Sequence, residues 1–285
     1  MKKVINAPDS KPSVWQAISP VEIVRDLWKH REVIGAFAAR EFQAAHRGTF
    51  LGLIWTIVSP LFMLAVFAFV FGYVFNGRFA TDVPETPLDY ALALFVGISF
   101  FNCIGQTLGN ASTLILANSS YVKTNVFPLE VIPVASVLNI LFNLAIGIGL
   151  CSFAFLVTHG FIHLTALFLI PLAASISLMA LGASWMLSSL ALFVRDIPAI
   201  IPPIVLVLMF MSGVFFPIEF VPPRVRIIVL LNPIAVIIDQ ARDALLYGRA
   251  PALLPMFVIF VLSLVIAIIG RFIFVRTRPA FADVV

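Results

Sequence analysis

Residues 48–77 contain no charged side chain, and further uncharged apolar runs of similar length follow along the chain. A stretch of about 20 apolar residues is long enough to cross the hydrocarbon core of a bilayer. Of all residues, 61% are hydrophobic and 11% are charged, whereas soluble domains carry about 25% charged residues. These runs exclude a water-soluble globular fold and predict an all-α integral membrane protein.

After a polar segment of about 50 residues, the apolar runs are enough for about six transmembrane helices. Their expected bounds are residues 51–75, 91–117, 131–157, 164–194, 199–218 and 252–270. We therefore expect a cytoplasmic tail and interface helix over residues 1–50, followed by a six-span transmembrane domain over residues 51–285.

The polar N-terminal segment contains a helix-start signature. Ser19 fits the N-cap, Pro20 the first helical position, and Glu22 the position three residues after the cap. Over residues 22–47, apolar side chains share one face and charged side chains lie largely opposite. This pattern predicts an amphipathic helix on the inner membrane surface. A solvated helix that leads into the first span fits the same periodicity.

Residues 219–251 differ from the spans, because their apolar runs alternate with charged residues and are interrupted by Pro222, Pro223 and Pro233. Two short re-entrant helices that dip into the outer interface fit this pattern better than a further span.

The distribution of Lys and Arg predicts the orientation, because these residues favour the cytoplasmic side of a membrane. With six spans and both termini in the cytoplasm, only five of the 18 basic residues would lie outside: Arg78, Arg224, Arg226, Arg242 and Arg249. The four arginines in 219–251 are the weak point of this topology. The basic N-terminal segment adjoins a span, so membrane orientation explains it better than nucleic-acid binding.

The predicted spans lack the ionisable groups on which ion-coupled transport depends, since all 14 acidic residues fall in the tail, the loops or the span ends. The histidines are scattered, so no metal or catalytic site is expected. No glycine-rich phosphate loop occurs, and we expect no cofactor in this chain. Two charged clusters, Arg195 with Asp196 and Asp239 with Arg242 and Asp243, are more simply interface pairs than parts of an embedded enzyme.

Uncharged polar side chains form a stripe along the second predicted span. Its members, spaced by three or four residues and so on one helix face, are Ser99, Asn102, Gln106, Asn110 and Thr113. Ser136, Asn139 and Asn143 repeat the pattern on the third span. Such stripes either hold helices together through hydrogen bonds or line a polar path.

An aromatic face on the first predicted span is the second candidate lining of a path. It consists of Trp55, Ser59, Phe62, Phe69 and Tyr73. Aromatic rings can stack on sugar rings without ionic contacts, although lipid contact is the simpler role for any single Phe. The candidate substrate path therefore combines these aromatic residues with Asn102, Gln106 and Asn110.

Five groups of residues, in order along nearly the whole chain, resemble one known family. They are Arg40-Glu41 with RGTFLGLIW at 47–55 and SPL at 59–61; YVK at 121–123 with NVFP at 125–128 and Ile132-Pro133; FVRDI at 193–197; Asn232-Pro233 with RDAL at 242–245 and Gly248; and RPAFAD at 278–283. This series resembles the membrane subunits of ABC transporters that export polysaccharides, the O-antigen and teichoic acid permeases.

The chain departs from the family pattern at two places. Ser212-Gly213-Val214 stands where the family has Ser-Pro followed by an apolar residue. Leu129 stands where the family often has a charged residue.

The resemblance implies that two copies of the chain enclose a channel in the bacterial cytoplasmic (inner) membrane, surrounded by membrane lipids. Each copy would dock one separate ATPase subunit, which binds ATP and magnesium. The implied cargo is a lipid-linked polysaccharide, O-antigen in the first place. Teichoic acid, capsular polysaccharide, a drug or a small lipid are alternatives within the ABC class, and a channel or secondary transporter is the alternative outside it.

The resemblance also implies site residues. Contact with the ATPase subunit falls on Arg40, Glu41, Tyr121, Lys123, Phe127 and Pro128. The external gate falls on Asn232 and Pro233. In the simpler reading, Lys123 is a cytoplasmic anchor and Pro128 begins a helix.

Overall fold

The computed structural model describes residues 19–46, 52–74, 79, 86–123 and 127–284. Within these ranges every regular element is a helix and no strand occurs. The predicted all-α fold is thus confirmed.

Five segments of the described chain are long and apolar enough to cross a membrane. They are Gly52–Val74, formed by η1 (Gly52–Ile54), α4 (Trp55–Phe67) and η2 (Ala68–Val74); α5 (Pro87–Ala111); α8 (Val131–His159); η3 (Leu164–Phe168) with α9 (Leu169–Phe193); and Leu253–Val284, which is mainly α13 (Leu253–Thr277). The protein is therefore a multi-pass membrane protein.

The fifth predicted span corresponds to a shorter helix, α10 (Ile197–Met211), of 15 residues. At 1.5 Å per residue it measures about 22 Å, less than the ~30 Å of a bilayer core. The second span also differs from the prediction. Its helix α5 ends at Ala111, and a turn separates it from α6 (Leu114–Ala117).

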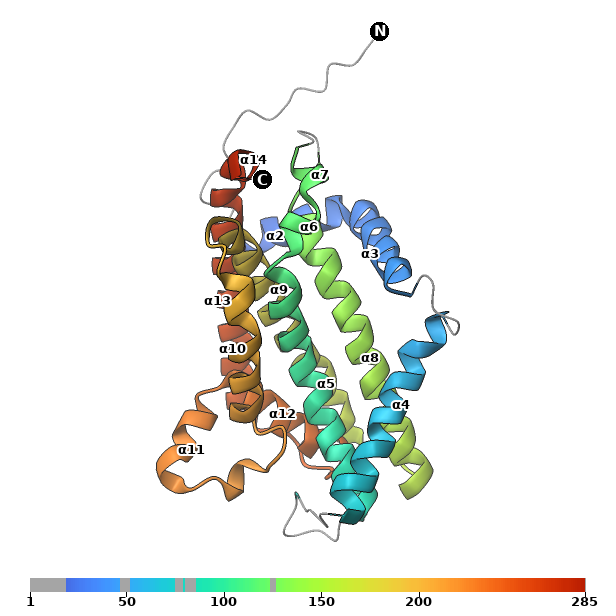
Figure 1. Cartoon of the computed structure of the whole chain (residues 1–285). Coiled ribbons are helices and arrows are strands. Elements are labelled where there is room, and N and C mark those ends of the chain that lie inside the picture. The colour runs from blue at the N-terminus through green and yellow to red at the C-terminus, as the bar shows by residue number, and fades with distance from the viewer. Residues whose placement is uncertain (1–18, 47–51, 75–78, 80–85, 124–126, 285) are drawn as a thin grey trace.

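The long helices run side by side, and the short ones gather at the two ends of the bundle (Figure 1). One end, which we call the terminal end, carries α2 (Pro20–Lys29), α3 (Arg31–His46), α6, α7 (Ser119–Val122) and α14 (Phe281–Val284). The opposite end carries α11 (Pro223–Leu230) and α12 (Pro233–Leu245). These are the two short helices that the sequence predicts within 219–251.

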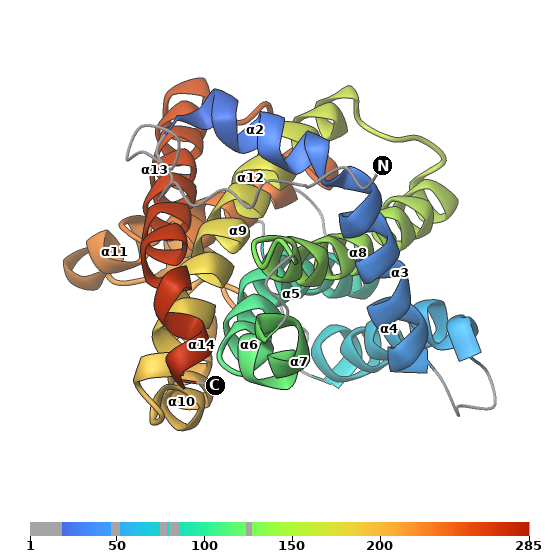
Figure 2. The ribbon, with the colours of Figure 1, turned by 90° about the horizontal axis from the view of Figure 1, so that it is seen from above.

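Helix α5 forms the centre of the bundle and α4 stands at its rim, as the view along the bundle shows (Figure 2). In the apolar centre of α5, 72% of the residues are buried, against 11% in Gly52–Val74. The α4 segment therefore leaves most of its surface to lipid or to a second chain.

Two glycines allow a close crossing of α9 and α13. A Cβ atom at Gly182 would collide with the Ile266 carbonyl, and one at Gly270 would collide with the Gly182 carbonyl. Small residues at such crossings let helix backbones approach, which is a main source of packing energy within a membrane.

The predicted N-terminal helix begins at Pro20 as expected but breaks at His30 into α2 and α3. Ile34 and Phe37 of α3 are buried, whereas Val21 and Trp28 of α2 are exposed. An ion pair between Asp26 and Arg271, 2.8 Å long, ties α2 to α13. A second pair, Arg278 with Glu130 at 2.7 Å, ties the end of α13 to the start of α8.

Candidate functional site

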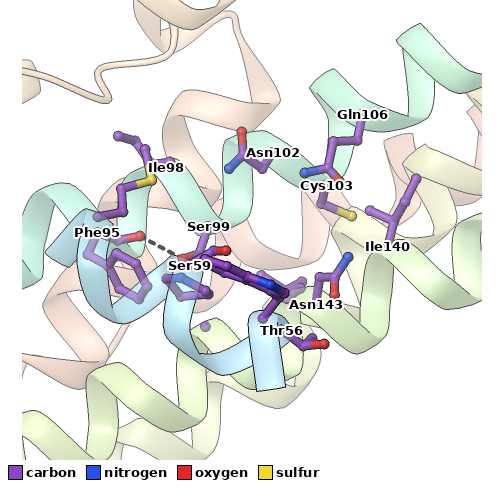
Figure 3. A pocket seen from close by; sticks show the side chains of 15 residues that line it. Thr56, Ser59, Phe95, Ile98, Ser99, Asn102, Cys103, Gln106, Ile140 and Asn143 are labelled. Carbon is purple, nitrogen blue, oxygen red and sulfur yellow. Dashed lines mark hydrogen bonds between the residues drawn. The ribbon is translucent and has the colours of Figure 1, made fainter. Parts of the chain in front are cut away.

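A cavity of about 300 Å³ lies where α4, α5 and α8 meet (Figure 3). Helix α4 contributes Trp55, Thr56, Ser59, Pro60 and Met63; α5 contributes Phe95, Ile98, Ser99, Asn102, Cys103 and Gln106; α8 contributes Ile140, Asn143, Leu144 and Gly147. This lining contains apolar, hydroxyl and amide groups and no charged side chain. The cavity therefore suits a neutral ligand that carries both apolar and hydrogen-bonding surface.

Three amide side chains supply the polar part of the lining: Asn102, Gln106 and Asn143. Within the described part of the chain, none of the three forms a side-chain hydrogen bond. The Ser99 hydroxyl, in contrast, donates to the Phe95 carbonyl of its own helix at 2.7 Å. The amides thus keep their donors and acceptors available to a ligand or to water.

The members of the polar stripes lie in two different surroundings. Asn139 joins helices, because its amide donates to the Glu41 carboxylate at 3.4 Å and so links α8 to α3. Asn102 and Asn143 instead face the cavity. The stripe on α8 therefore serves packing at one residue and lines the cavity at another.

The predicted path residues divide into two sets. Trp55, Asn102 and Gln106 line the cavity, and Asn110 is exposed. Phe62, Phe69 and Tyr73 do not line it and are 71%, 65% and 72% exposed. These three rings therefore lie on the exposed surface of the Gly52–Val74 segment, which contains Pro60 and passes into the π-helical η2.

An aromatic cluster at the terminal end gathers three of the predicted ATPase-contact residues. The Arg40 guanidinium donates to the Tyr121 hydroxyl and lies 4.6 Å from the centre of the Phe37 ring. The Tyr121 and Phe127 rings are 4.7 Å apart. We call Phe37, Arg40, Tyr121 and Phe127 the Arg40–Tyr121 cluster. It joins α3 to the segment that follows α6.

The remaining predicted contact residues flank this cluster. Lys123 is exposed, and Pro128 is half-buried just before α8. Glu41 is also half-buried, and desolvation raises the pKa of its carboxyl above the usual value, while the Asn139 hydrogen bond and the Arg40 charge oppose this shift. The predicted contact residues thus include a partly desolvated carboxylate and an exposed lysine.

The predicted gate residue Asn232 connects α12 to the end of α10. Its Oδ1 accepts from the Ile234 backbone N–H at 3.0 Å and so caps α12. Its Nδ2 donates to the Met211 carbonyl at 3.3 Å and to the Ser212 hydroxyl at 3.0 Å. Pro233 is the first residue of α12, a position at which its missing N–H costs nothing.

Comparison with known proteins identifies the family. A family model described as ABC-2 type transporter matches residues 32–246. The chain belongs to this family. An O-antigen export system permease protein, RfbA of Myxococcus xanthus, is 23% identical to it over 266 residues, which cover 92% of this chain and 99% of the relative. A Klebsiella pneumoniae protein of the same name is 22% identical over 251 residues, covering 86% and 92%.

These matches confirm the resemblance found in the sequence. The chain is a membrane subunit of an ABC exporter and a permease, and it is not itself catalytic. Membership of the family also implies that the permease pairs with an ATP-binding subunit.

The permease contains a buried charge that sequence reasoning missed. The charge pattern alone pairs Arg242 with Asp239 and Asp243; in the structure Arg242 is also 3% exposed and donates to three backbone carbonyls, those of Ala93, Gly213 and Val214. These partners could not be predicted from the sequence, because every residue carries a backbone carbonyl.

The two departures from the family pattern have local explanations. Gly213 has a φ of +61°, which proline, fixed near −65°, cannot adopt. The turn after α10 is therefore built differently from one that contains Ser-Pro. Leu129 is 6% exposed and packs in a core cluster with Ile132 and Trp185, so an apolar side chain suits this site.

Proposed function

We propose that two copies of this permease form the channel of an exporter that carries a lipid-linked polysaccharide, of the O-antigen type, across the bacterial cytoplasmic membrane. A separate ATPase subunit, two copies for two permeases, binds ATP and magnesium and supplies the energy. The names of the relatives that match over most of their length support this cargo.

The uncharged cavity between α4, α5 and α8 is the observation on which the proposal depends. Sugar hydroxyls donate and accept hydrogen bonds, and the free amides of Asn102, Gln106 and Asn143 match both needs. The Trp55 indole lines the same cavity, and an aromatic ring can stack on the apolar side of a sugar. A lining without charges lets a long hydrated chain move past without being held by ion pairs.

The orientation follows from the distribution of basic residues. The terminal end, where α2 and α3 carry Arg25, Lys29, Arg31 and Arg40, would face the cytoplasm, and the α11–α12 end would face outward. The ATPase subunit would then meet the Arg40–Tyr121 cluster together with Glu41, Lys123 and Pro128. Asn232 and Pro233 would belong to the external gate.

One experiment tests the assembly and the cargo separately. The permease, tagged at its N-terminus, is purified in mild detergent from its native cell, and proteins present in stoichiometric amount are identified. We expect an ATPase subunit at two copies per two permeases, and loss of surface polysaccharide when the permease gene is deleted. A lone permease oligomer, even after gentle cross-linking, would contradict the exporter. An ATPase partner with unchanged surface polysaccharide would instead refute the cargo.

A further inference from the structure

Arg242 lies in α12 at the end of the bundle opposite the termini, and its guanidinium reaches two other elements. Its Nε donates to the Ala93 carbonyl of α5 at 2.8 Å. Its Nη1 and Nη2 donate to the carbonyls of Gly213 and Val214, at 2.8 and 2.6 Å. These carbonyls belong to the turn that follows α10. One side chain thus joins three segments of the chain.

Two glycines shape the socket that receives this guanidinium. A Cβ atom at Gly97, one helical turn after Ala93, would collide with Nη2 of Arg242. Gly213 adopts a φ of +61°, a conformation that L side chains rarely take. The Phe79 ring closes the socket, with its centre 4.2 Å from the guanidinium carbon. The guanidinium therefore fits because Gly97 has no side chain and because Gly213 allows the backbone conformation of the turn.

Two further side chains hold the same turn and the end of α10. Tyr90 of α5 lies with its hydroxyl 3.5 Å from the Phe215 carbonyl. Asn232, at the start of α12, donates to the Ser212 hydroxyl and the Met211 carbonyl. All of these contacts connect α5, the 212–217 turn and α12. Helix α11 receives none of them.

A buried guanidinium is an expensive way to hold helices together, since its desolvation offsets much of what its hydrogen bonds contribute. Apolar packing would hold the same elements at lower cost. Ionisable groups buried in membrane proteins therefore point to function rather than to stability alone.

We propose that Arg242 is a positioning residue for transport: it clamps α12 and the 212–217 turn to α5, so that these three segments move as one body when the permease changes conformation. The cavity-lining helix α5 then carries the α12 end with it. The channel then opens at the α12 end either by movement of α11 or by movement of α5, the 212–217 turn and α12 together. Helix α12 does not move away from α5. The transport part of this inference rests on the proposed function, and the structural part does not.

Four variants test the clamp in the purified permease with its ATPase subunit. Arg242→Lys keeps the charge but loses the planar fork of donors, and Gly97→Ala pushes on the guanidinium without changing any charge. The matched controls are Arg276→Lys, at an exposed arginine of α13, and Gly149→Ala, where a new Cβ meets no atom within 4 Å.

Hydrogen exchange of backbone amides is the first measurement. In Arg242→Lys and Gly97→Ala we expect exchange over residues 212–217 and α12 to become about tenfold faster, on the scale of lost hydrogen bonds to a charged group. Exchange in α8 and α9 stays as in the unchanged permease, as it does everywhere in both controls. Unchanged exchange over 212–217, or an equal rise throughout the chain, would overturn the clamp.

A double-mutant cycle identifies the contact itself. Gly97→Ala should accelerate exchange in the unchanged permease but have little effect in Arg242→Met, because the guanidinium that the new Cβ meets is gone. Equal effects of Gly97→Ala in both backgrounds would show that the new Cβ disturbs a residue other than Arg242. That result would refute the proposed fit between Gly97 and the guanidinium.

Coupling is the measurement that separates positioning from a merely structural role. In Arg242→Lys we expect the ATPase subunit to remain bound and to hydrolyse ATP at its normal rate, while export falls about tenfold, as when a positioning group is displaced. Normal export despite faster exchange would refute the functional part. If the cargo assignment is wrong, surface polysaccharide does not respond even to deletion of the gene, whereas the exchange results still stand.

Discussion

The Arg40 guanidinium donates a hydrogen bond to the Tyr121 hydroxyl across 81 positions of sequence. The same guanidinium lies 5.3 Å from the centre of the Tyr121 ring. This pair fixes α3 against the segment after α6, so two separate parts of the chain present one surface. A partner that binds there would move both parts together.

Replacement of Tyr121 should therefore weaken the hold on the ATPase subunit. Tyr121→Phe keeps the contacts with Phe37 and Phe127 but loses the hydroxyl, so we expect a fall of about fivefold in co-purified ATPase, on the scale of one hydrogen bond. Tyr121→Ala should reduce it further, because the rings lose their partner. Equal ATPase recovery in all three proteins would show that the surface lies elsewhere.

Trp55 and Phe62 differ in their relation to the cavity, which makes them a matched pair. Trp55 lines it, whereas Phe62 does not and is 71% exposed. We expect Trp55→Ala to reduce surface polysaccharide about fivefold, on the scale of one lost aromatic ring contact worth ~1 kcal/mol. Phe62→Ala should change export little. Quantified surface glycan at equal permease levels checks this, and equal losses in the two variants would contradict the path through the cavity.

Glu41 should make stability depend on pH. Its raised pKa means that the charged form is disfavoured in the folded protein, so the stability that protonated Glu41 contributes is present at acid pH and is lost as pH rises through the folded pKa. Glu41→Gln keeps the acceptor for Asn139 without the charge. The excess of its thermal midpoint over that of the unchanged permease should be smaller near pH 4 than near pH 7, because more of Glu41 is protonated at the lower pH.

The control for this prediction is Asn139→Ala, which removes the hydrogen bond at every pH. It should lower the thermal midpoint at both pH values. A Glu41→Gln protein that is less stable than the unchanged permease near pH 7 would show that the carboxylate charge stabilises α3.

Gly182 should tolerate no side chain. A Cβ there meets the Ile266 carbonyl, which is rigid backbone of the facing helix, so Gly182→Ala should cost about 1–3 kcal/mol through overpacking. Gly149→Ala introduces the same methyl group into open space. Detergent-extracted protein level and thermal midpoint should fall in the first variant only, and a normal midpoint for Gly182→Ala would refute the close crossing.

Asn232 combines a helix cap with a link to α10, and two substitutions separate these roles. Asn232→Asp keeps an oxygen that accepts from the Ile234 N–H, so α12 stays capped. It loses the donor to Met211 and Ser212. Asn232→Ala loses both and should cost about 1 kcal/mol more through the missing cap. If export depends on the link to α10, export should fall in both variants. A fall in export in Asn232→Ala alone would show that Asn232 acts only as the cap of α12.

The class of protein could be predicted from the sequence, because apolar segments of about 20 residues without charges are suited to a lipid bilayer and not to water. The start of α2 at Pro20 and the two short helices in 219–251 were also predictable, since caps and prolines act locally. The length of α10 was not, because helix ends within an apolar run depend on the turn that follows, here at Gly213.

The candidate site was predictable in part. The spacing of Asn102 and Gln106 placed both on one face of α5, and the structure turns that face to the cavity. Phe69 and Tyr73 lie outside the cavity on the exposed surface of their segment, so their place in the substrate path stays a prediction.

Side-chain chemistry and local spacing are enough to predict that this chain is helical, spans a membrane and carries uncharged polar faces. The three-dimensional packing was needed to show which amides remain free, that Arg40 meets Tyr121, and that Arg242 is held by carbonyls of α5 and the 212–217 turn. Such contacts join residues far apart in the chain. Every residue has a backbone carbonyl, so residue types do not show which carbonyls a distant guanidinium will bind.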